Sequence, residues 1–197
     1  MNVQEATTRR LPDLKERHLP ENCRETINTI LKETYGYEQF RNLEIYDDLS
    51  KGKEKLCISQ GQLIENVILE AEKAWKSETQ VDNILLTAPT GSGKSLLFQL
   101  PAIYLGKEYN LLTIVVSPLK ALIVDQVESL QELGYARVAY ASSDLSPEQK
   151  MEVYRQVREG EIDLFYLSPE LLLSYDIKHF VGERRIGLVV VDEAHTV

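Results

Sequence analysis

The sequence has few of the features that mark secreted, disulfide-bonded or membrane proteins. Its 197 residues include only two cysteines, Cys23 and Cys57, which are far apart and lack a histidine pattern suited to a metal. Two isolated thiols favour a reducing compartment over a disulfide framework or a zinc site. No run approaches the roughly 18 apolar residues of a membrane span, and the N-terminal residues have no apolar signal-peptide core. We therefore expect a cytoplasmic protein with no membrane partner.

The chain also has little positive charge. It carries 22 Lys and Arg against 31 Asp and Glu, a formal net charge of −9. A protein whose whole surface attracts phosphate would be basic, so any nucleic-acid contact must come from a local groove. The 43% of hydrophobic residues is enough for a buried core. The length suits one compact domain with an appendage.

Two regions differ in their apolar pattern. Residues 1–60 are expected to form a helical N-terminal extension, with apolar residues at helical spacing over 24–35. This helix should stop before Gly36. A second helix is predicted from about Gln60 to Lys76, and the polar segment 43–59 is predicted to be a loop or a short irregular element.

From residue 61 onward, short apolar runs alternate with amphipathic segments. Near-continuous hydrophobicity is typical of strands buried on both faces of a parallel sheet. Helices are predicted to start near Lys94, Leu119, Pro147 and Pro169, and Ser146 and Ser168 are suitable caps. The pattern predicts an α/β three-layer sandwich over 61–197, with ligands bound beyond the carboxyl ends of the strands. The predicted strands are 83–88, 111–117, 136–141, 162–168 and 186–193.

The strongest motif is APTGSGKS, which runs from Ala88 to Ser95 between a predicted strand and a predicted helix. It matches the phosphate-binding loop pattern, although Ala88 stands where glycine is common. Glycines let backbone N–H groups converge on phosphate oxygens. Lys94 supplies a charge for the β- and γ-phosphates, and the Ser95 hydroxyl is a ligand for Mg²⁺. A merely structural turn is the alternative. The expected nucleotide contacts are Thr90, Gly91, Ser92, Gly93, Lys94 and Ser95.

The second motif is VVVDEAH, which places Asp192 and Glu193 at the carboxyl end of an apolar run. Asp192 is the expected holder of Mg²⁺, and Glu193 the expected general base that activates water. An acidic pair after a strand is also a common way to begin a loop. The phosphate loop 98 residues earlier, counted from Lys94 to Asp192, favours the functional interpretation.

Together these motifs resemble those of superfamily 2 helicases, and several further stretches are similar to the RecQ family. These stretches are TYGYEQFR (34–41), SGKSLLFQLPAIYL (92–105), SPLKALIVDQVESL (117–130) and FYLSPELLL (165–173). The resemblance covers about 34–197. It implies a RecA-like P-loop NTPase lobe preceded by a helical segment, with ATP and Mg²⁺ as nucleotide and metal.

The resemblance also implies a nucleotide-contacting element ahead of the phosphate loop. Phe40 and Arg41 match its Phe-Arg pair, but Glu44 occupies the position where relatives usually place an adenine-reading glutamine. A loop insertion would move that role to Gln62 or, less favourably, Gln60. Both glutamines are equally well explained as solvent-facing residues at a helix start.

Two serine-proline segments match the family's nucleic-acid motifs. Taken locally, Ser-Pro pairs are ordinary helix starts, and the agreement with the family pattern favours contacts with backbone phosphates. Asp125 and Gln126 belong to the same block without a clear role, and His195 is either a link to a partner lobe or structural. The expected nucleic-acid contacts are Ser117, Pro118, Leu119, Lys120, Ser168 and Pro169.

The resemblance implies the first motor lobe of an ATP-dependent 3′–5′ DNA helicase that acts on single-stranded or forked DNA. The second RecA-like lobe is missing from this sequence, so we expect the chain alone to bind nucleotide weakly and to have little activity. The alternatives are a nucleotide-gated DNA- or protein-binding module, and a double-strand translocase or RNA helicase of the same superfamily.

Overall fold

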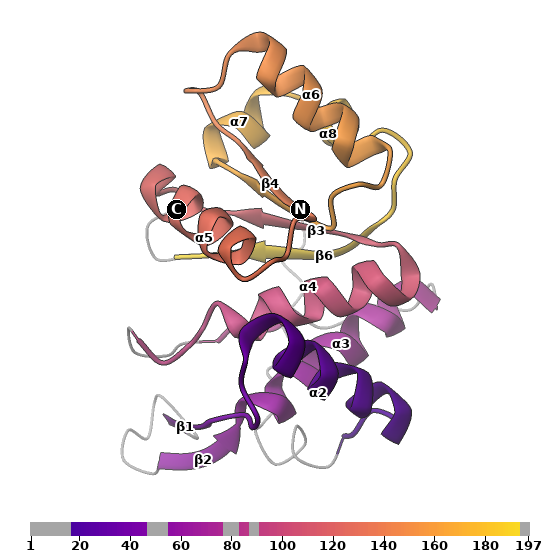
Figure 1. The fold of residues 1–197 in the computed structure, drawn as a ribbon, viewed down its shortest axis with the longest axis vertical. Coiled ribbons are helices and arrows are strands. Elements are labelled where there is room, and N and C mark those ends of the chain that lie inside the picture. Colours follow the sequence, from indigo (N-terminus) through magenta and orange to yellow (C-terminus); the bar gives the residue numbers. More distant parts are fainter. Residues whose placement is uncertain (1–16, 47–54, 77–82, 87–90, 194–197) are drawn as a thin grey trace, which may run out of the picture. The chain divides into compact units, whose positions relative to one another are not determined.

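A computed structural model describes residues 17–46, 55–76, 83–86 and 91–193 of the chain. The chain divides into two compact units, Met1–Pro101 and Ala102–Val197. Helix α4, Leu96–Tyr109, runs through the boundary between these units (Figure 1). The predicted division at residue 60 stays a prediction. No helix in the described ranges is both long and apolar enough to span a bilayer.

The first unit contains two helices where the apolar periodicity predicts them. Helix α2 spans Glu21–Tyr35 and ends at Gly36, which adopts a left-handed φ of 69°. Glycine adopts this conformation without a Cβ penalty, so the helix stops there. Helix α3 spans Gln60–Lys76, the predicted bounds. Both helices bury one apolar stripe, formed by Ile27, Ile30, Leu31, Leu63, Ile64, Ile68 and Ala71.

A β-hairpin joins these two helices, where the sequence predicts a loop. Strand β1, Asn42–Tyr46, pairs antiparallel with β2, Lys55–Ser59. The loop prediction is therefore wrong for these residues. Leu43 and Ile58 face each other across the pair and are both buried. Apolar and polar residues do alternate in both strands, but each alternating run covers only about four or five residues, near the shortest length that identifies a strand.

The second unit is built on a four-stranded sheet in the order β4-β5-β3-β6. Each neighbouring pair is parallel. Parallel strands need crossover connections, and helices supply them between successive strands. This arrangement agrees with the predicted α/β class. The strands are β3 Leu112–Val116, β4 Val138–Ala141, β5 Leu164–Leu167 and β6 Ile186–Val191.

The helices of the second unit cover the two faces of this sheet. Helices α6, Pro147–Arg158, and α8, Ile177–Val181, lie together (Figure 1) and pack on one face. Helix α5, Lys120–Glu132, bonds to Tyr166 on the other face. The short helix α7, Pro169–Ser174, follows β5. The core of the first face includes Ile114, Val116, Ala139, Tyr154, Val157, Phe165, Leu167 and Phe180.

The predicted strand 83–88 is not observed in its described part, residues 83–86. Ile84 and Leu85 are 45% and 82% exposed. A strand persists only when a neighbour satisfies its backbone groups, and no described residue pairs with this segment. The β6 strand also exposes Val189 and Val191. An apolar run predicts a strand, but it does not show whether a neighbouring strand is available to pair with it.

An ion cluster around the buried Asp163 lies at the amino-terminal ends of the strands. The Asp163 carboxylate accepts hydrogen bonds from Arg137 Nε at 2.6 Å, Arg184 Nη2 at 3.0 Å and Tyr135 Oη at 2.9 Å. The hydrogen bond to Asp163 raises the pKa of Arg137, whereas burial lowers the pKa of Arg184. Both guanidinium groups remain charged. A Cβ on Gly106 of α4 would lie 2.4 Å from Asp163 Cγ, so the helix approaches this cluster only because residue 106 has no side chain.

Gly106→Ala should therefore destabilise the chain although alanine is the better helix former by about 1 kcal/mol. The added methyl must displace the helix or the buried carboxylate, and such overpacking costs about 1–3 kcal/mol. Urea unfolding followed by circular dichroism measures the change in the free energy of unfolding. Ser129→Ala, on the exposed side of α5, is the control. A variant more stable than the parent would contradict this packing.

Candidate functional site

The described part of the predicted phosphate loop is a glycine-rich turn that leads into α4. Gly91 and Gly93 have φ of 78° and 80°, a conformation that other residues rarely adopt. Lys94 and Ser95 form the last turn before the helix, and their carbonyls accept from Leu97 and Gln99 N–H groups, both at 2.9 Å. The first amides of a helix carry partial positive charge and bind anions. Thr90 lies outside the described residues.

Gln60 braces this loop from the start of α3. Its side chain is buried, and its Nε2 donates to the carbonyls of Ser92 at 3.3 Å and Gly93 at 3.4 Å. Its Oε1 accepts from the Arg41 N–H at 3.1 Å. A Cβ on Gly93 would lie 2.7 Å from Gln60 Nε2, so this approach also requires glycine. The amide of Gln60 thus joins the phosphate loop to the Phe-Arg element.

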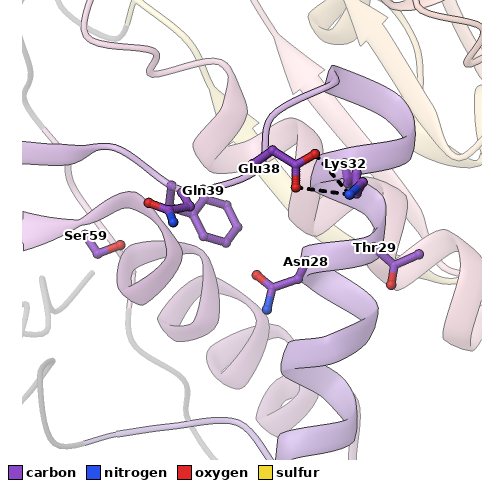
Figure 2. A pocket seen from close by; sticks show the side chains of 7 residues that line it. Asn28, Thr29, Lys32, Glu38, Gln39 and Ser59 are labelled. Atoms are coloured by element: carbon purple, nitrogen blue, oxygen red, sulfur yellow. Dashed lines mark hydrogen bonds and ion pairs between the residues drawn. The ribbon is translucent and has the colours of Figure 1, made fainter.

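Phe40 and Arg41 lie beside this brace. The Phe40 ring packs against Gly61, where a Cβ would be only 2.6 Å from it, and the Arg41 guanidinium sits 5.7 Å from the centre of the Tyr37 ring. Phe40 also lines a pocket of about 520 Å³ (Figure 2), and two other lining residues, Lys32 and Glu38, form an ion pair at 3.0 Å. The other lining residues are Asn28, Thr29, Gln39 and Ser59.

Gln62 lies elsewhere on α3. Its Nε2 donates to the Arg17 carbonyl at 3.5 Å, a long contact. In the described part of the chain, Gln60 contacts both the phosphate loop and Arg41. Which of the two glutamines reads adenine stays a prediction. Because the contact between Gln60 and Ser92 spans 32 residues, local pattern could not reveal it.

In the second unit, Asp192 and Glu193 follow β6 at its carboxyl end. The Asp192 N–H donates to the Val116 carbonyl of β3 at 2.9 Å, so the backbone continues the strand pairing up to this residue. Its Oδ1 accepts from the Glu193 N–H at 3.0 Å. Glu193 has a φ of 50°, a conformation rare for residues other than glycine and often found at functional sites.

Gln126 connects Asp192 to the middle of the sheet. Its Oε1 accepts from the buried Tyr166 hydroxyl at 3.0 Å, and its Nε2 donates to Asp192 Oδ2 at 3.4 Å. Because Tyr166 takes the oxygen end of the amide, the nitrogen end must face the carboxylate. Gln126 therefore orients Asp192. The sequence left this residue without a role.

Three serines form a row at the carboxyl edge of the sheet. Ser117, Ser168 and Ser142 each come directly after a strand, β3, β5 and β4 in turn. The preceding residues are aligned in register, Val116 with Leu167 and Leu167 with Ala141. All three serines are buried. Among the described residues, the Ser117 and Ser142 hydroxyls have no hydrogen-bond partner, whereas Ser168 Oγ accepts from the Leu171 N–H at 3.4 Å as the cap of α7.

The remaining predicted nucleic-acid residues surround this row. Leu119 is 53% exposed at the start of α5, and Pro118 is half-buried. Pro169 is the first residue of α7. Lys120, the first residue of α5, reaches the loop after β4, where its Nζ bonds to Ser143 Oγ and to Asp144 Oδ1, the latter at 2.9 Å. The predicted residues of this group therefore share one edge, together with a loop that the sequence did not single out.

The comparisons with known proteins identify the family of the chain. The model of the "DEAD/DEAH box helicase" family matches residues 69–197. The chain belongs to this helicase family. It is 33% identical over 174 residues to ATP-dependent DNA helicase Q-like 5 of Arabidopsis thaliana, and 33% over 174 residues to RecQ of Synechocystis. The alignments cover 88% and 87% of this chain, but 16% and 30% of those helicases.

RecQ of Bacillus subtilis is a third relative, 31% identical over 169 residues, with 86% of this chain and 23% of the relative covered. Among solved structures, the DUF1998 helicase MrfA bound to DNA and AMPPNP matches with a TM-score of 0.54 and 22% identity, over 91% of this chain and 22% of that one. At this identity the match supports the fold alone. The predicted RecA-like fold and RecQ resemblance of this helicase chain are confirmed. The chain spans less than a third of each relative's length.

The residues predicted to handle nucleotide fall in both units. Lys94 and Ser95 belong to the first, and Asp192 and Glu193 to the second. That these four residues meet around one nucleotide stays a prediction. Within the described ranges, no three His, Cys, Asp or Glu residues form a metal-binding group. Mg²⁺ commonly takes only one or two protein oxygens and completes its shell with water and phosphate, so one carboxylate and one hydroxyl suit it.

Gln60→Ala should weaken nucleotide binding by about ten-fold. The substitution removes the hydrogen bonds that order the phosphate loop, so part of the binding free energy is then used to order the loop. Titration of a fluorescent ATP analogue gives the dissociation constants of the chain and of its variants. Gln156→Ala, on helix α6 of the second unit, is the control and should change the constant less than two-fold. An unchanged constant for Gln60→Ala would contradict the proposed role of this contact.

Proposed function

We propose that the chain is the ATP-binding first motor lobe of a RecQ-type, ATP-dependent DNA helicase. In this proposal, ATP hydrolysis drives 3′–5′ movement along single-stranded DNA and the unwinding of duplex. The proposal rests chiefly on one observation: the residues of motif II and of the expected nucleic-acid contacts all follow parallel strands of one sheet, at the same edge. Family membership and the relatives' names support the reaction type.

The roles of the chain's own residues follow from their chemistry. The amides around Gly91 and Gly93 and the ammonium of Lys94 would hold the phosphates of ATP. Glu193 would accept the proton of the attacking water. Mg²⁺, when bound through Ser95 and Asp192, would neutralise charge on the β- and γ-phosphates. Gln126 would keep the Asp192 carboxylate turned toward that site.

Lys94→Ala should reduce nucleotide affinity by at least ten-fold, because one full charge on the phosphates is lost. Glu193→Gln should preserve nucleotide affinity and reduce DNA-stimulated hydrolysis by at least 100-fold, as expected for loss of a general base. Binding is measured with the chain, and turnover with the chain joined to a second lobe. Unchanged turnover in Glu193→Gln would show that the base is another residue.

The same turnover assay separates the alternatives. Stimulation by single-stranded DNA supports the proposed class, whereas stimulation only by RNA or only by duplex DNA indicates an RNA helicase or a double-strand translocase. A protein that binds nucleotide and DNA but never hydrolyses ATP is instead a nucleotide-gated binding module. The intact Glu193 favours the enzyme over this module, since a binder has no need of a base.

Gln126→Leu tests the orientation of Asp192. The substitution nearly keeps the volume of the side chain but removes both hydrogen bonds, so the carboxylate loses a fixed donor. The Mg²⁺ concentration needed for half-maximal nucleotide binding should rise by about three- to ten-fold, the effect of losing an outer-shell partner of a metal ligand. Gln131→Ala on the same helix is the control. An unaltered Mg²⁺ requirement would mean that Gln126 serves only Tyr166.

A further inference from the structure

The carboxyl edge of the sheet contains a loop that the family motifs do not explain. Residues 142–144 follow β4, the strand separated from β3 by β5. Lys120, just after β3, nevertheless contacts Ser143 and Asp144 in this loop. Neighbouring strands lie about 4.8 Å apart, so the contact crosses about 10 Å of edge above the end of β5. We call this contact between Lys120, Ser143 and Asp144 the Lys120 bridge.

The bridge spans the serine row at the ends of β3, β5 and β4. Two members of the row, Ser117 and Ser142, have buried hydroxyls with no hydrogen-bond partner in the ranges that the structure describes. Buried polar groups are normally satisfied, so an unpaired hydroxyl in a native structure calls for a ligand, water or a second conformation. Hydroxyl groups and an ammonium are the groups that proteins use to contact nucleic-acid phosphates. Of the groups in the bridge and the serine row, only the Asp144 carboxylate would repel a phosphate.

The Asp144 carboxylate pairs with the Lys120 ammonium as a phosphate group would. Its Oδ1 lies 2.9 Å from Lys120 Nζ and accepts a second hydrogen bond from Ser143 Oγ at 3.2 Å. The hydrogen bond from Lys120, followed by that from Ser143, holds the pKa of Asp144 below its usual value, so the carboxylate is charged at neutral pH. The side chains of Lys120 and Asp144 are 45% and 67% exposed. Exposed ion pairs contribute little to stability and exchange readily.

We propose that Asp144 is an internal counter-anion that occupies Lys120 until a backbone phosphate of single-stranded nucleic acid displaces it. This inference rests on the proposed function, since it assumes that nucleic acid lies along this edge. Displacement opens the Lys120 bridge and gives the strand an ammonium at the serine row. The carboxylate also repels phosphates that do not reach Lys120. The chain, which already carries a net charge of −9, thereby limits unspecific attraction of phosphates at Lys120.

The test is a double-mutant cycle on DNA affinity. The chain and its Asp144→Asn, Lys120→Ala and doubly substituted variants are titrated into a labelled 20-nucleotide oligothymidylate, with fluorescence anisotropy read at several salt concentrations. Asp144→Asn should tighten binding by about three- to ten-fold at low salt, the scale of one exposed charge near a phosphate chain. Lys120→Ala should weaken binding and lower the salt slope by about 0.7, the loss of one single-strand phosphate contact.

The decisive comparison is the effect of Asp144→Asn in the Lys120→Ala background. If Asp144 acts by occupying Lys120, the tightening should fall below two-fold there. If Asp144→Asn increases DNA affinity equally with and without Lys120, the Asp144 charge acts on DNA independently of Lys120, and the proposal is wrong. Glu132→Gln, which removes one charge at the other end of α5, is the control and should leave affinity within two-fold.

The same data separate this inference from the proposed function. If Lys120→Ala weakens binding but Asp144→Asn does not tighten it, nucleic acid uses this edge and the counter-anion role is wrong. If Lys120→Ala leaves both affinity and salt slope unchanged, nucleic acid does not contact Lys120. The nucleic-acid contact proposed for Lys120 and the counter-anion role of Asp144 are then both wrong. Circular dichroism of each variant confirms that the fold is retained.

Discussion

The parallel direction of all four strands is the constraint on which the second unit depends. Because β4, β5, β3 and β6 run the same way, the residue after each strand falls on one edge. Four separated positions in the sequence, Ser142, Ser168, Ser117 and Asp192, thereby become neighbours along a line. A sheet with one reversed strand would send one of these side chains to the opposite edge. The chemistry of the unit follows from its topology.

The two edges of this sheet use polar groups in opposite ways. At the amino-terminal edge, Asp163 is fully paired with two arginines and a tyrosine, and Gly106 lets α4 come close. Such a satisfied network fixes the fold. At the carboxyl edge, the Ser117 and Ser142 hydroxyls have no partner in the described part of the chain, and Lys120 is held by two exposed groups, the Ser143 hydroxyl and the Asp144 carboxylate. Stability is concentrated at one edge, and the groups available to a ligand are at the other.

Sequence pattern predicted the features that depend on local order. The bounds of α3, the stop of α2 at Gly36 and the strand ends at Ser117, Ser168 and Asp192 follow from periodicity, a left-handed glycine and apolar run length. Contacts between distant residues were not predictable in this way. Gln60 reaches the phosphate loop and Gln126 reaches Asp192 across 32 and 66 residues, and nothing near either glutamine signals its partner. Ser142 has no proline after it and therefore resembled an ordinary loop residue.

The central claim is that the phosphate loop and the acidic pair serve one nucleotide. A crystal structure of the chain with a non-hydrolysable ATP analogue and Mn²⁺ in place of Mg²⁺ tests it most directly, because the anomalous signal of Mn²⁺ locates the metal without assumption. The account predicts a single manganese peak that has the Ser95 hydroxyl as a direct ligand and the Asp192 carboxylate as a direct or water-bridged ligand, with the analogue's phosphates beside Lys94. A manganese peak bound to only one of the two motifs, with the other motif facing away from the nucleotide, would contradict it.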